Sequence, residues 1–118
     1  MRIDREIVEE EINTEEDLII AVDTVVFKKK VTCRNIVSEN YKRNIDARNI
    51  DAGNIDAGNI DAGNIDAGNI DAGNINAGNI NAGFIVCEER KFKSETSKTI
   101  CKNLTTKRST YKKKEVKQ

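Results

Sequence analysis

Aspartates at five-residue intervals are the groups of this chain whose type and spacing could do chemistry. They recur in the phrase N-I-D-A-G, which is written almost without change from Arg43 to Ile85. The row consists of Asp46, Asp51, Asp56, Asp61, Asp66 and Asp71. Carboxylates in a row can hold a cation, act in acid–base catalysis or contact a basic partner. Which of these applies depends on the element that carries the row.

The remaining residues favour contact with a partner over metal binding or catalysis. The chain has no histidine, and Cys33, Cys87 and Cys101 form no CxxC pair, so we expect reduced, packed cysteines. Calcium-binding repeats carry Gly-Gly-x-Gly-x-Asp about every nine residues, a phrase absent here. Carboxylates on a convex surface also lack a pocket. We therefore expect no enzyme activity, no metal and no cofactor, and treat the aspartate row as a candidate partner-contact surface.

The period of five determines which element can carry this row. Five residues turn an α-helix by about 140° beyond a full circle, which would scatter the repeated isoleucines around the helix. On a flat strand an odd step sends them to opposite faces. A chain that bends once every five residues points every isoleucine at a common axis. We expect four such sides to close a square coil of about twenty residues, stacked at about 4.8 Å.

The inward residues follow from the same geometry, because residues two apart in an extended chain share a face. Turning the Gly or Arg column inward instead would bury the unpaired guanidinium groups of Arg43 and Arg48, at a cost of several kcal/mol. We therefore place that column outside, with Gly-Asn pairs at corners where a positive φ is tolerated. Whether Ile or Ala is the central inward residue stays open. The predicted inward set is Ile45, Ile50, Ile55, Ile60, Ile65, Ile70, Ile75 and Ile80 with Ala47, Ala52, Ala57, Ala62, Ala67 and Ala72.

The phrase I-(D/N)-A-(G/R)-N, read from Ile45 to Asn49 and onward, resembles the A-(D/N)-L-x-x repeat of the pentapeptide-repeat proteins. Its inward pair is reversed in size relative to that repeat. The resemblance implies an all-β fold, a right-handed quadrilateral β-helix. Some members of the family imitate duplex DNA, bind type II topoisomerase and protect it from quinolones, which makes DNA gyrase the alternative partner. The shortness of the aspartate row and the basic C-terminal tail argue against that role.

The segments around the repeat predict further organisation. Ile3, Ile7, Val8 and Ile12 fall on one side of a helix with acidic residues opposite, which indicates a short α-helical cap on the first coil. The expected division is an acidic helical cap over 1–17, irregular first coils over 18–43, the regular β-helix over 44–85, an irregular coil or strand pair over 86–106 and a basic mobile tail over 107–118.

Charge and hydropathy limit the classes of function that the chain can have. The 20 Lys and Arg balance the 20 Asp and Glu, but acids gather before Asp23 and bases after Glu88. Few aromatic residues accompany the bases, so we expect no direct nucleic-acid binding. The apolar run Leu18–Val22 is too short for a signal peptide or a membrane span. We expect a cytoplasmic bacterial protein that acts as a noncatalytic structural or interaction protein, with a homodimer through an end of the rod as a further expectation.

Overall fold

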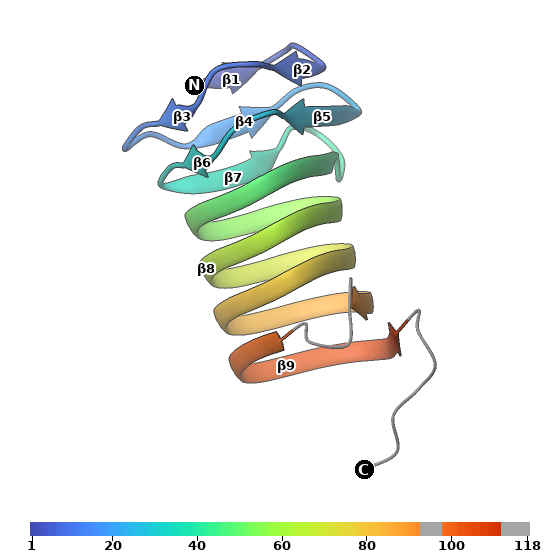
Figure 1. The fold of residues 1–118 in the computed structure, drawn as a ribbon. Helices are drawn as coiled ribbons and strands as arrows, with labels where there is room; N and C mark the ends of the chain where they lie inside the picture. Colours follow the sequence, from blue (N-terminus) through green and yellow to red (C-terminus); the bar gives the residue numbers. More distant parts are fainter. Residues whose placement is uncertain (93–97, 112–118) are drawn as a thin grey trace.

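The chain forms an all-β solenoid in the computed structural model, which describes residues 1–92 and 98–111 (Figure 1). The strands are β1 (Arg2–Ile3), β2 (Ile7–Val8), β3 (Ile12–Asn13), β4 (Leu18–Ile20), β5 (Thr24–Phe27), β6 (Val31–Thr32), β7 (Asn35–Ser38), β8 (Asn44–Phe92) and β9 (Lys98–Tyr111). The strand pairings run parallel, as expected when a chain winds repeatedly in one sense. The long strand β8 forms the successive coils in the middle of the rod.

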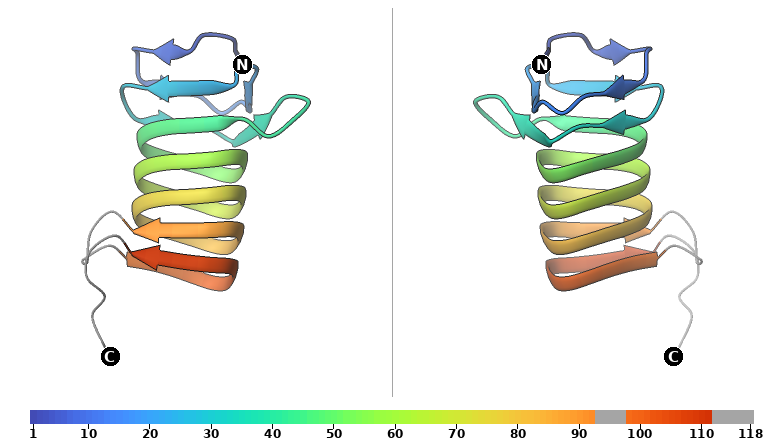
Figure 2. Two further views of the ribbon diagram at one scale, coloured as in Figure 1. Left: turned by 90° about the vertical axis from the view of Figure 1, so that its right-hand side faces the viewer. Right: turned by 90° about the vertical axis from the view of Figure 1, so that its left-hand side faces the viewer.

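Each coil of the repeat has three sides and fifteen residues. The Nδ2 of Asn64 donates to the Oδ1 of Asn49, fifteen residues earlier, and Asn79 donates to Asn64 in the same way. Three five-residue phrases therefore complete one turn. Figure 2 shows the stacked turns from two sides of the rod. The predicted square coil of four sides is wrong. A five-residue period fixes how often the chain bends, but it does not fix the angle of each bend.

The core of the repeat consists of stacked isoleucines and alanines. The repeat isoleucines from 45 to 85 keep at most 3 % of their surface exposed, and the alanines from 47 to 82 at most 7 %. Both columns point inward because they stand two residues apart in extended chain. Burying one isoleucine is worth roughly 1.5 to 3 kcal/mol. The repetition of this contact from coil to coil stabilises the rod along its length.

The glycines stand where successive coils approach each other most closely. A Cβ atom on Gly68 would lie 2.7 Å from the carbonyl oxygen of Gly53, and one on Gly83 would lie 2.8 Å from that of Gly68. None of the described glycines has a positive φ, so the expectation of positive-φ corners is wrong. Glycine is required here because a side chain would meet the backbone of the preceding coil.

The N-terminal segment is β-structure, and the described residues contain no helix in place of the predicted cap. Ile3, Val8 and Ile12 are buried, each on a different short strand, whereas Ile7 is 50 % exposed. A helical face would have buried Ile7 together with Ile3. Intervals of four or five residues between inward side chains suit the sides of a coil as well as a helix, which is why the pattern was ambiguous.

The coils before the repeat are longer than those within it. Arg2 pairs with Ile19, seventeen residues on, and Thr24 pairs with Asn44, twenty residues on. The extra residues form connections between short strands, and one of them projects from the rod between β7 and β8 (Figure 2). The predicted irregular first coils over 18–43 correspond to β4–β7 with these connections.

The C-terminal end continues the stack. Strand β9 pairs with β8 in parallel from Asn79↔Lys98 to Phe92↔Tyr111. The predicted coil or strand pair over 86–106 is thus the end of β8 together with most of β9. The predicted tail begins at Lys107, but β9 extends to Tyr111, and residues 112–118 lie outside the described part of the chain.

Within the described residues there is no helix of the length and apolarity needed to cross a bilayer.

Candidate functional site

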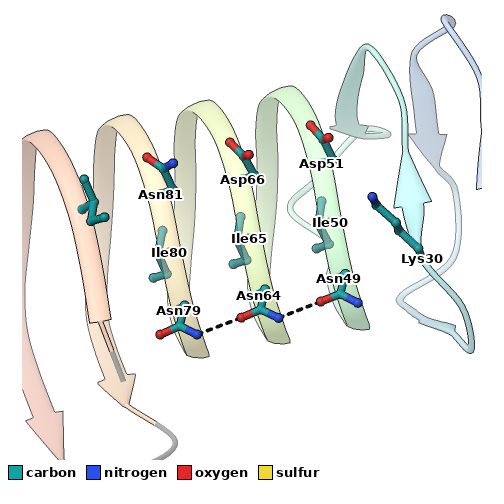
Figure 3. Close-up of a pocket in the computed structure, with 11 residues that line it drawn as sticks. Lys30, Asn49, Ile50, Asp51, Asn64, Ile65, Asp66, Asn79, Ile80 and Asn81 are labelled. Carbon is teal, nitrogen blue, oxygen red and sulfur yellow. Dashed lines mark hydrogen bonds between the residues drawn. The ribbon is translucent and has the colours of Figure 1, made fainter. Parts of the chain in front are cut away.

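The outer surface of the repeat consists of three similar faces. On each side of a coil the phrase N-I-D places Asn and Asp outward and Ile inward, so each face carries an Asn column and an Asp column. A shallow groove runs along the rod between the two columns, shown for one face in Figure 3. Face A carries Asn44, Asn59 and Asn74 with Asp46, Asp61 and Asn76; face B carries Asn49, Asn64 and Asn79 with Asp51, Asp66 and Asn81; face C carries Asn54 and Asn69 with Asp56 and Asp71.

Hydrogen bonds between side-chain amides join the coils along each Asn column. On face C the chain of bonds begins before the repeat, where Asn35 donates to Asp17 at 2.9 Å. Asn54 then donates to Asn35 at 3.1 Å, and Asn69 donates to Asn54 at 2.7 Å. A typical hydrogen bond contributes about 0.5–1.5 kcal/mol net. The ladders also fix the orientation of each amide, which leaves a regular polar surface.

The aspartates stack at fifteen residues, and the predicted stacking at twenty, such as Asp46 over Asp66, is wrong. Asp46 lies over Asp61 on face A, and Asp51 lies over Asp66 on face B. Each face therefore carries two acids, and the next position up is neutral: Asn76, Asn81 and Val86. Two carboxylates about 4.8 Å apart in water repel by roughly 1 kcal/mol. Ending each Asp column after two acids limits this repulsion.

Lys42 pairs with both acids of face C and offsets one of their two charges. Its Nζ lies 2.5 Å from the Oδ1 of Asp56 and 3.3 Å from the Oδ1 of Asp71, on two successive coils. Desolvation lowers the pKa of Lys42, but the hydrogen bonds and charges of the two carboxylates outweigh it, so the net pKa is raised. The six predicted contact residues thus do not form one equivalent surface. Those of face C are engaged within the chain, while Asp46, Asp51 and Asp66 are exposed on the other two faces.

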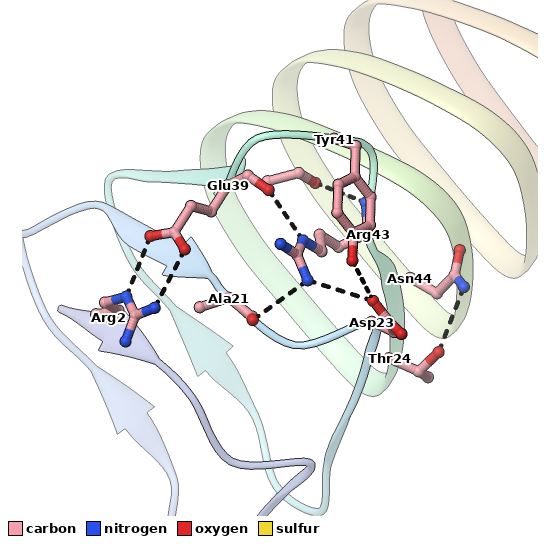
Figure 4. A network of polar contacts seen from close by, with 9 residues as sticks. Arg2, Ala21, Asp23, Thr24, Glu39, Tyr41, Arg43 and Asn44 are labelled. Carbon is pink, nitrogen blue, oxygen red and sulfur yellow. Dashed lines mark hydrogen bonds and ion pairs between the residues drawn. The ribbon is translucent and has the colours of Figure 1, made fainter.

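A buried arginine, Arg43, joins the irregular coils to the repeat, and its burial was not expected from the sequence (Figure 4). The guanidinium of Arg43 donates to the backbone oxygens of Glu39 at 2.9 Å and Ala21 at 3.2 Å. It also lies 3.3 Å from the Oδ1 of Asp23 and stacks on the ring of Tyr41 at 3.9 Å. Arg43 is only 6 % exposed although it lies outside the Ile and Ala core, because the connection that carries Glu39 and Tyr41 covers it.

The burial of Arg43 is tolerated because the guanidinium has partners. The predicted cost applied to an unpaired guanidinium, whereas the structure supplies a carboxylate, two carbonyl oxygens and an aromatic face. Asp23 stands twenty residues before Arg43, one coil away. The opposite charges at this spacing could have indicated the contact from the sequence. Arg48, the other arginine of that column, is exposed as predicted.

The two described cysteine side chains are buried and free. Burial, followed by the nearby charges of Asp17 and Asp51, raises the pKa of the Cys33 thiol to about 11. Burial also raises the pKa of Cys87. Both thiols therefore stay protonated and unreactive at neutral pH. The side chain of Cys101 lies outside the described set.

Within residues 1–92 and 98–111, no group of three or more acidic, cysteine or histidine side chains could hold a metal ion. Comparison with protein-family models, with curated proteins and with solved structures finds no significant match for this chain. The structure itself defines the class: a β-solenoid repeat protein whose outer faces carry regular columns of Asn and Asp.

Proposed function

We propose that the protein is a noncatalytic repeat protein that binds a partner along the sides of its solenoid. The observation that supports this is the repetition of the same outward groups on successive coils, held in line by the Asn ladders. Such a surface offers several identical contacts in a row and suits an extended or repetitive partner. Regular, extended surfaces of this kind are typical binding surfaces of solenoids.

Faces A and B are the proposed contact surface, and a basic segment of another protein is the proposed partner. Asp46, Asp51 and Asp66 are exposed and have no ion pair with another described residue. On face C, Lys42 already occupies the equivalent position of a basic ligand by spanning Asp56 and Asp71. We expect a partner lysine or arginine to span the stacked pair Asp51 and Asp66 of face B in the same manner.

A capture experiment with matched variants tests this proposal. The immobilised wild-type protein, the double variant Asp51→Asn/Asp66→Asn and the double variant Asp56→Asn/Asp71→Asn are each exposed to lysate from the source cell. Both double variants remove two charges, but only the first removes them from a face that is open to a partner. We expect bound proteins to be lost with the first variant and retained with the second. Equal capture by both variants would show that face B is not the contact surface.

The coil shares only part of its geometry with the pentapeptide-repeat proteins that the sequence resembles. The five-residue side with two inward residues is shared, while the coil has three sides where that family has four. We propose the right-handed winding that the resemblance implies, because crossover connections between parallel strands are right-handed in about 98 % of cases.

Imitation of duplex DNA, with DNA gyrase as the partner, is the second candidate, and one observation favours it. Three aspartates per coil, at about 4.8 Å per coil, place roughly one carboxylate per 1.6 Å of axis, close to the value of about 1.7 Å for duplex DNA. Against it, the acids occupy only the stretch from Asp46 to Asp71, and Lys42 offsets one of the two charges of face C. A gyrase supercoiling assay with and without a quinolone tests this candidate. Inhibition or protection of gyrase at micromolar protein would make DNA imitation the preferred function. No effect would exclude it.

A further inference from the structure

The two ends of the rod carry opposite charge. The first coil, residues 1–17, contains eight carboxylate side chains and only two arginines. Glu6, Glu9, Glu11 and Glu15 of this coil have no ion pair with another described residue. At the other end, β9 carries Lys98, Lys102, Lys107 and Arg108 and no acidic residue. The acidic end of one molecule is therefore complementary in charge to the basic end of another, and two like ends repel each other.

The backbone is also unpaired at both ends within the described structure. Strands β1, β2 and β3 each have one neighbour, β4, β5 and β6, and β9 has only β8. The carbonyl oxygens of Ile3 and Val8 accept hydrogen bonds from the second coil. Alternate residues of a parallel strand bond to opposite neighbours, so the groups of Arg2 and Ile7 face the open end. An edge of this type is a template for another strand.

Strand direction selects the arrangement of two rods. Translation of one rod along its axis places β9 of one copy against β1–β3 of the next with all strands parallel, the pairing found throughout the rod. A symmetric contact between two like ends would pair the strands antiparallel and set acid against acid or base against base.

We propose that the protein associates head to tail with further copies of itself, the acidic first coil of one molecule docking on the basic last coil of the next. This contact is heterologous, so each molecule keeps one free end and the assembly extends along the solenoid axis. The inference goes beyond the proposed function and does not depend on it, because it uses the ends of the rod and not its faces.

The size of the contact makes the association weak. The cross-section of the rod measures 24 × 22 Å, which limits one end to roughly 500 Å² and a contact to about 1,000 Å² of total buried surface. Specific interfaces of this size are at the lower limit of stable ones. We therefore expect assembly that rises with protein concentration and falls with salt. The Debye length falls from about 30 Å at 0.01 M to about 3 Å at 1 M ionic strength.

Two end-blocked variants of the full chain test the proposal. The first, Glu9→Lys/Glu11→Lys, reverses charge on the first coil, and the second, Lys98→Glu/Lys102→Glu, reverses charge on the last. Circular dichroism first confirms that both retain the wild-type spectrum and melting temperature. Sedimentation velocity at low salt should then show species beyond a dimer for the wild type. Each blocked variant alone should stay at the 13.2 kDa of one chain, with association at least about tenfold weaker.

The decisive sample is a mixture of the two blocked variants. The first variant carries lysines at both ends and the second carries glutamates at both ends, so equal amounts should associate with each other although neither variant associates alone. The double variant Asp51→Asn/Asp66→Asn of face B is the control and should assemble like the wild type. A wild type that is monomeric at low salt, or blocked variants that each still dimerise, would overturn the proposal.

Discussion

The repeat and the coils that precede it bury their cores by different means. In the repeat, every side contributes one Ile and one Ala, and the coil length stays at fifteen residues. Next to each glycine, the backbone of the preceding coil occupies the space that a side chain would need. In the first coils the spacing between paired residues varies from seventeen to twenty, and larger side chains such as Phe27 and Leu18 fill the core. The stacked columns of the repeat do not allow its coils to vary in length. The first coils can vary in length, but specific side-chain pairs must hold each of them in place.

The polar contacts differ in the same way. The repeat uses one bond, Asn to Asn, again and again. The first coils use individual pairs: Arg2 donates twice to Glu39, both at 3.1 Å, and Arg43 contacts Asp23. Loss of one element should therefore propagate along the repeat but stay local in the first coils.

Ile65→Asp should unfold the rod. Ile65 is 2 % exposed, so the change removes roughly 1.5–3 kcal/mol of apolar burial and places an unpaired carboxylate in the core. We expect complete loss of the cooperative melt followed by circular dichroism. The control Asp66→Asn, one residue on, should be neutral or slightly stabilising because it relieves repulsion with Asp51. Equal tolerance of both changes would contradict the inward placement of Ile65.

Gly68→Ala should destabilise the repeat by about 1–3 kcal/mol, because the added Cβ overpacks the corner. That atom would lie 2.7 Å from the carbonyl oxygen of Gly53, so the two coils must separate. Arg48→Ala, at the same position of the repeat on an exposed residue, is the control and should cost little. Urea unfolding measures both variants, and a Gly68→Ala protein as stable as the control would contradict the close approach of the coils.

Arg43→Ala should cost about 1–3 kcal/mol and loosen the joint between the two regions. The Ala21 carbonyl oxygen loses the Arg43 donor, and the Glu39 carbonyl oxygen keeps the N–H of Tyr41 but loses Arg43. Hydrogen exchange followed by mass spectrometry should show faster exchange around β4–β7 and unchanged exchange in the middle of β8. Uniform acceleration along the chain would show that the joint is not a local element.

Asn64→Ala should cost about 0.5–1.5 kcal/mol, because Asn64 donates to Asn49 and accepts from Asn79 at the surface. Asn13→Ala, an exposed residue of β3 outside the ladders, is the control. Thermal melts of the two variants at equal concentration provide the comparison. No difference between them would mean that water replaces the ladder without loss.

The smallest effect at neutral pH comes from Cys33. Its folded pKa of about 11 exceeds the usual value near 8.5, so the folded state holds the proton to higher pH. Its contribution is complete below about pH 8.5 and is lost as the pH rises towards 11. Unfolding free energies from pH 7.5 to 10.5 should therefore fall more steeply for the wild type than for Cys33→Ala. Parallel curves would exclude the thiol as the cause.

The solenoid and its inward columns could be predicted from sequence because they depend on local spacing. Ile and Ala two residues apart must share a face, and a bend every five residues must collect them on one axis. The number of sides could not be predicted, since it depends on the bend angle. The first coil was mistaken for a helix because Ile3, Val8 and Ile12 fit either structure until the exposure of Ile7 separates them.

The polar part of the site was harder to predict because its partners come from different coils. The aspartate row was visible in the sequence, but its division into faces depends on the fifteen-residue turn. Lys42 reaches Asp56 and Asp71 from a projecting connection, at separations of fourteen and twenty-nine residues. Neither separation is a multiple of five, so no periodicity could have indicated the contact.

The three-sided coil also has a genetic consequence. Nearly identical phrases invite slippage during replication, and a gain or loss of single phrases is the expected mutation. Deleting fifteen residues would shorten the rod by one coil and leave every column in place. Deleting five would preserve the core yet turn the last coil by one third of a revolution relative to the first. Alleles that differ by one phrase would therefore fold alike but present Phe84 and Val86, exposed on face C, in a different direction.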